Sequence, residues 1–522
     1  MQSTEKTKKD PQYDALKSTT HTRNVGSIAL ATTTTSIVAF LLAPFVLEKL
    51  GDNKYGVWAL LNTVFGLSGL LDLGLRSSFD QRFTRAWHKR NERYKARTYA
   101  TGKKITFFLS VTTGFATILI ALGMWLSTAE GFAYRSELIL VTVAFGIQTS
   151  SSFFFFPHNA VINAARRFDI VGQLDILDNL LTAALMFACV SYTDNLGILA
   201  VCCFTPKALR FFYVRNIATR IYHPPQGAKP SAKLFAIFFR TGVLRFVSSS
   251  SVQIIRQIDT LTIFLICGIS LVAPYALGAS IAARLLQLQQ CYRLTMQGEM
   301  MKLAANSRLL DLQSTLLTTT RYVLLLLIPP TLISILYAPE FFSLWISKSP
   351  AVLALAPENI YSFLAIYSFC IMACSPLTQA LTALEQHASL AKLVAVEAAL
   401  NLTLSITLGF LLGSIGVAAA SAAACCLVHI PGRIALAKNH FPAITLGTLK
   451  GSITRPVICV LVFLPVLYYS KTLYSVTTWS SLLAVGSCTC IIWFPIAYAI
   501  GLNGKERLVV QKTVLRFGTA EA

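Results

Sequence analysis

Residues 76–104 read RSSFDQRFTRAWHKRNERYKARTYATGKK, and they separate two apolar runs at 56–75 and 105–126. Each run has about 20 residues, which is the length that a helix needs to cross a hydrocarbon core of about 30 Å. The stretch between them is rich in Lys and Arg, as is typical of short loops on the cytoplasmic side of a membrane. It therefore predicts two transmembrane helices joined by a cytoplasmic loop.

Similar apolar runs recur along all 522 residues. We therefore predict an all-α polytopic membrane protein with about 14 transmembrane helices. A composition of 54% hydrophobic and only 13% charged residues excludes an ordinary soluble domain. The predicted spans are residues 25–47, 56–75, 105–126, 138–160, 174–191, 197–216, 236–266, 275–297, 322–337, 359–381, 393–411, 415–437, 456–470 and 478–500.

The distribution of basic residues predicts the orientation of these spans. If the N-terminus is cytoplasmic, the outside segments carry 5 of the 45 Lys and Arg residues, namely Lys49, Lys54, Arg135, Lys348 and Lys471. Both polar tails, 1–24 and 501–522, are then cytoplasmic. This sidedness accounts for most of the net charge of +22, so we expect anionic membrane lipids and no nucleic acid as partners of the basic segments.

A weak internal repeat predicts how the helices are grouped. Leu50-Gly51 and Tyr55-Gly56 resemble Cys267-Gly268 and Tyr275-Ala276. The repeat divides the chain into two six-helix halves, 25–235 and 236–438, followed by two additional helices within 439–500. Because six is an even number, both halves begin on the cytoplasmic side, and we predict parallel repeats about an axis along the membrane normal.

The predicted span 236–266 is unusually polar. One helical face of it carries Arg245, Ser249, Gln253, Arg256 and Thr260, with Asp259 beside them. The next span adds Arg284 and Gln287. A charge at the bilayer centre costs about 3 kcal/mol, so we expect these side chains to face protein or a water-filled cavity. Arg256 and Asp259 are either an interior ion pair or part of that cavity, and for Arg245 and Arg284 we predict a substrate-binding role.

The sequence contains no sign of catalysis or of a resident metal. It has no P-loop and no Asp-x-Asp pair, so we expect neither an enzyme nor a cofactor. The 12 cysteines lie in or at the ends of apolar spans without a CxxC pair, and we interpret them as packing residues. His158 and His429, which lie inside spans, are also interpreted as packing residues. Glu397 and Asp259 are the candidates for ion coupling.

The run Leu50-Gly51-Asp52-Asn53-Lys54-Tyr55-Gly56-Val57-Trp58-Ala59-Leu60-Leu61, followed by Gly69-Leu70-Leu71-Asp72-Leu73-Gly74-Leu75, carries a family resemblance. It resembles the signature of polysaccharide-transport flippases, the O-antigen and exopolysaccharide translocases of the multidrug, oligosaccharidyl-lipid and polysaccharide exporter superfamily. Weaker matches follow in order at Ala165–Asp169, Asp259, Tyr275 and Gly413–Ala418.

The resemblance implies two bundles around a central cavity that opens alternately to either face. It implies a polyprenyl-diphosphate-linked oligosaccharide as cargo, moved from the cytoplasmic to the outer leaflet of the plasma (bacterial inner) membrane for surface polysaccharide assembly. Polysaccharide polymerase or export machinery would be partners. Arginines fit the diphosphate, and Gln and Ser side chains fit a sugar.

Two other functions stay open at this point. A multidrug or toxic-compound cation antiporter of the same superfamily would need a cavity with a carboxylate and few fixed positive charges, which the arginines at 245, 256 and 284 disfavour. A membrane scaffold of a biosynthetic complex, without transport, would not need a polar face inside the membrane.

Reporter fusions test the predicted orientation. Fusions after Ser127 and after Ser349 should both score as extracytoplasmic, because each residue follows an odd number of predicted spans. A fusion within 76–104 is the cytoplasmic control. Cytoplasmic scores after both serines would overturn the topology.

Overall fold

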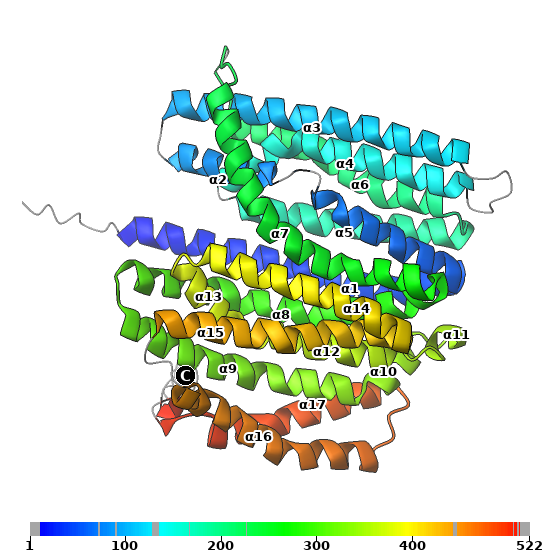
Figure 1. The fold of residues 1–522 in the computed structure, drawn as a ribbon, viewed down its shortest axis with the longest axis vertical. Helices are drawn as coiled ribbons and strands as arrows, with labels where there is room; N and C mark the ends of the chain where they lie inside the picture. Colours follow the sequence, from blue (N-terminus) through cyan, green and yellow to red (C-terminus); the bar gives the residue numbers. More distant parts are fainter. Residues whose placement is uncertain are drawn as a thin grey trace, which may run out of the picture. The chain divides into compact units, whose positions relative to one another are not determined.

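The structure, a computed structural model, describes residues 11–70, 72, 74–88, 91–127, 135–165, 167–225, 227–441, 446–504, 506–508 and 511. Within these ranges the chain forms helices and no strand (Figure 1). The side chains of α7 at 243–245 and 247–256 lie outside the description. The prediction of an all-α fold is confirmed.

The helices follow one another along the chain with short connections. The α-helices are α1 (Pro11–Gly66), α2 (Leu75–His88), α3 (Glu92–Ser127), α4 (Arg135–Ala164), α5 (Phe168–Tyr192), α6 (Leu196–Ile221), α7 (Ala232–Cys267), α8 (Val272–Ala305), α9 (Leu309–Leu336), α10 (Ala338–Trp345), α11 (Pro350–Leu353), α12 (Pro357–Ala373), α13 (Ser375–Ala383), α14 (His387–Ala424), α15 (Ile430–His440), α16 (Leu446–Leu473) and α17 (Trp479–Ile496). The short 3-10 helices are η1 (Leu67–Leu70) and η2 (Ile269–Leu271), and the π-helical turns are η3 (Cys425–His429) and η4 (Ala497–Gly501).

The chain forms two compact units. The first consists of Met1–Lys54 and Val64–Ser250, and the second of Tyr55–Thr63 and Ser251–Ala522. In the first unit α4 packs between α3 and α6 (Figure 1). In the second unit α12 packs against α8, α9 and α14. The predicted division into halves at 25–235 and 236–438, with 439–500 as an addition, remains a prediction.

The basic stretch 76–104 is mostly helical, with α2 and the first turns of α3 in it. Phe79 and Phe83 on α2 have exposed fractions of 2% and 0%, and the Phe79 ring lies 6.0 Å from the ring of Phe238 on α7. Arg85 on the same helix is exposed. The helix therefore buries its aromatic face in the core of the first unit, while Arg85 stays exposed and the Arg76 guanidinium lies 4.5 Å from the Phe156 ring centroid.

Eleven helices among the described residues are long and apolar enough to cross a membrane. One of these segments, His387–His440, covers two of the predicted spans, and Leu30–Val64 covers most of one predicted span and part of the next. The helical run of α1 is interrupted at Gly51, and that of α14 at Gly413. The chain is a multi-pass membrane protein, and the total of fourteen spans remains a prediction.

The chain reverses direction at Gly413. This residue has φ 63° and ψ −144°, a conformation that only glycine adopts without strain. Glu397 and His429, each sixteen residues from Gly413, lie 2.9 Å apart at their polar atoms. Residues 387–412 and 414–440 are therefore antiparallel neighbours, and we call this element the Gly413 hairpin.

The two glycines that the internal repeat aligns have nearly the same backbone conformation. Gly51 has φ 75° and ψ 168°, and Gly268 has φ 86° and ψ 176°. The aligned Tyr55 and Tyr275 are both buried, with exposed fractions of 9% and 4%. Matched sequence positions thus have matched local structure.

Replacing Gly413 by alanine should destabilise the second unit. A Cβ at this φ and ψ is strained by about 1–3 kcal/mol, so the Tm of the purified protein should fall. Gly486→Ala is the matched control, because Gly486 is helical and a Cβ there meets nothing within 4 Å. Equal Tm values for Gly413→Ala and Gly486→Ala would show that the reversal does not depend on glycine.

Candidate functional site

The predicted polar face of α7 is described only at its C-terminal end. The side chains of Arg245, Ser249, Gln253 and Arg256 lie outside the described residues, and their roles stay predictions. Asp259 and Thr260 are described, and both are buried, with exposed fractions of 4% and 8%. Asp259 is therefore the acidic residue of this face whose surroundings can be specified.

Hydroxyl groups from two other helices hold the Asp259 carboxylate. Tyr275 on α8 donates a hydrogen bond of 2.9 Å to Oδ2, and Ser421 donates one of 2.6 Å to the same oxygen. Ser405 donates to Oδ1 at 3.3 Å. Ser405 and Ser421 lie on opposite arms of the Gly413 hairpin. Among the side chains that the structure describes, no Lys or Arg pairs with this carboxylate.

Asn401 extends this cluster and has an unused acceptor. Its Nδ2 donates to Ser421 Oγ at 2.8 Å, whereas its Oδ1 is buried without a hydrogen-bond partner among the described groups. Leaving a buried carbonyl oxygen unsatisfied costs about 1–3 kcal/mol. All the side-chain atoms that make these hydrogen bonds are oxygen atoms, apart from the Asn401 amide nitrogen. We call Asp259, Tyr275, Asn401, Ser405 and Ser421 the Asp259 cluster.

A second buried cluster lies further along the Gly413 hairpin. His429 Nδ1 is 2.9 Å from Glu397 Oε2 and 3.1 Å from Oε1, and these side chains are 8% and 4% exposed. Arg433 Nη1 lies 3.9 Å from Glu397 Oε2 and donates to the His429 carbonyl oxygen at 3.2 Å. Arg433 Nε donates to Thr378 Oγ1 at 3.0 Å. The Glu397 charge is thus compensated by a guanidinium.

The Cys425 thiol lies beside Glu397 and His429 in the second cluster. Ligand atoms of Glu397, Cys425 and His429 all lie within 4.8 Å of one another, and all three residues are buried. Cys425 and His429 are the first and last residues of the π-helical turn η3, a rare conformation that is frequent at functional sites. Cys370 on α12 also contacts Cys425, and its Sγ lies 3.9 Å from Cys426 Sγ.

Arg284 and Gln287 on α8 are both half-buried. No carboxylate of the described part of the chain pairs with Arg284. A guanidinium in this state is free to bind an anion. The predicted substrate contacts of Arg284 and Gln287 remain predictions.

The first unit contains an ion-pair network of its own. Arg210 on α6 pairs with Asp175 on α5, and Arg210 Nη1 lies 3.6 Å from Asp178 Oδ2. Asn179 Nδ2 on α5 donates to Thr35 Oγ1 on α1 at 2.7 Å. These contacts join α1, α5 and α6 and have the character of structural interhelix bonds.

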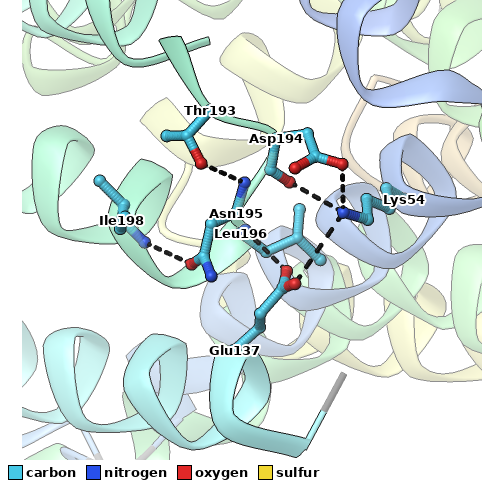
Figure 2. Close-up of polar contacts among 7 residues, drawn as sticks. All are labelled: Lys54, Glu137, Thr193, Asp194, Asn195, Leu196 and Ile198. Carbon is cyan, nitrogen blue, oxygen red and sulfur yellow. Dashed lines mark hydrogen bonds and ion pairs between the residues drawn. The ribbon is translucent and has the colours of Figure 1, made fainter. Parts of the chain in front are cut away.

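Lys54 on α1 contacts residues at the beginning of α4 and just before α6 (Figure 2). Its Nζ lies 2.6 Å from Asp194 Oδ2, 3.2 Å from the Asp194 carbonyl oxygen and 3.9 Å from Glu137 Oε1. Glu137 Oε2 accepts a hydrogen bond of 2.9 Å from the backbone N–H of Leu196, at the start of α6. The hydrogen bond from Lys54 lowers the pKa of the exposed Asp194 carboxyl. Lys54, a residue of the predicted family signature, therefore links α1 to the beginnings of α4 and α6.

The sequence singled out Asp259 and Glu397 but not their partners. Ser405, Ser421, Cys425, His429 and Arg433 were missed as site residues. The sequence pattern that predicts them is a polar residue at every fourth position on each side of Gly413. This spacing places polar side chains on one face of each arm at 397, 401 and 405, and again at 421, 425, 429 and 433.

Solved structures with the same fold are membrane transporters. The chain resembles the lipid II flippase MurJ in an inward closed conformation, with 13% identity, a TM-score of 0.68, and coverage of 90% of this chain and 98% of that chain. It resembles a multidrug resistance MATE family transporter of the MOP superfamily in an inward-facing conformation, with 14% identity, a TM-score of 0.58, and coverage of 77% and 94%. A MOP superfamily transporter from Pyrococcus furiosus, titled for the reverse polarity of its binding pocket, has 12% identity, a TM-score of 0.55, and coverage of 80% and 96%.

Sequence comparison identifies the family. A search of curated protein sequences finds no match. The family model described as "Polysaccharide biosynthesis protein" matches residues 21–289, which is more than half of the 522 residues. The chain belongs to the polysaccharide biosynthesis protein family.

Proposed function

We propose that the protein is a flippase for a polyprenyl-diphosphate-linked oligosaccharide. It moves this lipid from the cytoplasmic to the outer leaflet of the bacterial inner membrane by alternating access, for surface polysaccharide assembly of the O-antigen or exopolysaccharide kind. Membership of the polysaccharide biosynthesis family supports the class of cargo, and the fold shared with a lipid II flippase supports the transport of a lipid-linked sugar. Polymerase or export machinery would receive the product.

Arg284 is the observation that carries the proposal. It is a half-buried guanidinium on a predicted membrane helix, and no described carboxylate neutralises it. A charged side chain within a membrane segment costs free energy, so such a residue is expected to have a function. A diphosphate accepts the planar, two-pronged hydrogen bonds of arginine, whereas an organic cation would be repelled. Arg245, Arg256, Ser249, Gln253 and Gln287 are the further contacts that we expect.

We propose Asp259 as the site of ion coupling. Its described partners are neutral hydroxyl groups, which stabilise a buried carboxylate but do not cancel its charge. A proton or a small hard cation would cancel that charge, and the buried Oδ1 of Asn401, which has no described hydrogen-bond partner, is a candidate further oxygen ligand for a cation. Glu397 is less suited, because His429 and Arg433 already compensate it.

Replacing Arg284 tests the anionic cargo. In a flippase-null strain, Arg284→Ala should lower surface polysaccharide at least about tenfold, and Arg284→Lys should also impair it because lysine lacks the planar fork. Arg308→Ala is the matched control, since Arg308 is an exposed arginine that precedes α9 and pairs with Asp311 in its first turn. Membrane levels are measured for every variant.

Normal polysaccharide from a well-expressed Arg284→Ala variant would contradict the diphosphate contact. If the unaltered chain fails to restore polysaccharide but confers efflux of cationic drugs, the cation-antiporter function replaces the flippase.

Replacing Asp259 tests the coupling ion. In purified protein at constant ionic strength, exchanging K⁺ for Na⁺ should raise the Tm if Na⁺ binds the Asp259 cluster, because a ligand stabilises the state that binds it. Asp259→Asn should abolish the rise, whereas Asp311→Asn, at an exposed carboxylate, should keep it. A Tm that depends on pH but not on Na⁺, and loses this dependence in Asp259→Asn, would identify the proton. A Tm that responds to neither would make Asp259 a structural residue.

A further inference from the structure

We propose that Glu397, Cys425, His429 and Cys370 form a binding site for a borderline-soft divalent cation such as Zn²⁺. The site lies entirely within the second unit and is distinct from the Asp259 cluster and from the predicted cargo contacts. It joins α12 to both arms of the Gly413 hairpin.

The donor set matches zinc chemistry. Zn²⁺ takes thiolate, imidazole and carboxylate ligands at about 2.0–2.3 Å, so neighbouring ligand atoms of a tetrahedral site lie about 3.3–3.8 Å apart. The ligand atoms of Glu397, Cys425 and His429 already lie within 4.8 Å of one another. Small side-chain rotations close this set around an ion. The Asp259 cluster, whose acceptors are oxygen atoms, suits a harder cation instead.

Cys370 is the candidate fourth ligand, because it contacts Cys425, although its Sγ is not one of the atoms that lie within 4.8 Å of one another. Its thiol contacts Cys425 from α12, a helix that packs against α14 and against the π-helical turn η3. Four protein ligands make a closed site of the structural kind, with no position left for a reacting water. A metal here would hold three helical segments together.

The charges of the site balance when the ion is bound. Zn²⁺ and Arg433 contribute three positive charges, and the Glu397 carboxylate and two thiolates contribute three negative charges. Binding therefore releases the protons of both thiols, and His429 binds as the neutral imidazole. The His429 to Glu397 hydrogen bond gives way to two metal bonds. Arg433 keeps its bonds to Thr378 and to the His429 carbonyl oxygen, which orient it beside the site.

Cobalt titration of the purified full-length protein tests the site. Co²⁺ should bind with a thiolate-to-metal charge-transfer absorption in the near ultraviolet, and Zn²⁺ should displace it. Cys425→Ser, His429→Gln and Glu397→Gln should each weaken binding at least about tenfold, and Cys425→Ser should also reduce the absorption. Cys459→Ser is the matched control, because Cys459 is a fully buried cysteine on α16 that bonds the Ile496 carbonyl oxygen.

A second measurement guards against variants that fold poorly. Zn²⁺ should raise the Tm of the unaltered protein relative to chelator-treated protein, and the rise should vanish in Cys425→Ser but not in Cys459→Ser. Asp259→Asn should retain cobalt binding, so loss of ion coupling and loss of this site are distinguishable. Absence of the cobalt absorption in the unaltered protein, or unchanged affinity in Cys425→Ser, would overturn the proposal.

Discussion

Every polar group inside this protein must find a partner, because neither lipid nor a packed helix core supplies one. The helices satisfy the backbone, and the side chains are left to satisfy one another. The Asp259 carboxylate accepts hydrogen bonds from three hydroxyl groups, and the Glu397 carboxylate pairs with His429 and Arg433. Among the described residues, the Oδ1 of Asn401 is one of the buried polar atoms without such a partner.

The Gly413 hairpin puts both clusters in register. Because each arm repeats its face about every four residues, one reversal aligns a whole column of polar side chains against another. Shifting the reversal by a single residue would rotate each column away from the other by about 100°. The conformation of Gly413 is therefore a condition for both clusters, although the glycine touches neither of them.

The sequence was sufficient to predict the class of fold but only part of the candidate site. Apolar runs of about 20 residues identify membrane helices, because bilayer thickness fixes their length. The buried carboxylates Asp259 and Glu397 stand out, because a charge within an apolar run is rare. Their partners did not stand out, because Ser421 and Cys425 are ordinary residues of apolar helices. Their importance arises from contacts across the hairpin and with α7.

The interpretation of His429, Cys370 and Cys425 as packing residues stays a prediction, and the proposed metal site is the alternative to it. No carboxylate lies near Cys425 in the sequence, and Glu397 is 28 residues away. The reversal at Gly413 brings the two residues together. Arg245 and Arg256, by contrast, rest on the sequence pattern alone.

The burial of α2 has a consequence for how fast the protein would meet an anionic lipid. Phe79 and Phe83 anchor this helix in the core, so the backbone positions that carry basic side chains such as Arg85 are fixed. In the predicted orientation these charges face the leaflet from which an anionic lipid would be taken. A fixed basic surface raises the local concentration of anionic lipids, and salt screens this attraction within about 8 Å at physiological ionic strength. The encounter frequency with an anionic lipid would then depend on ionic strength, even where the affinity of the transport site does not.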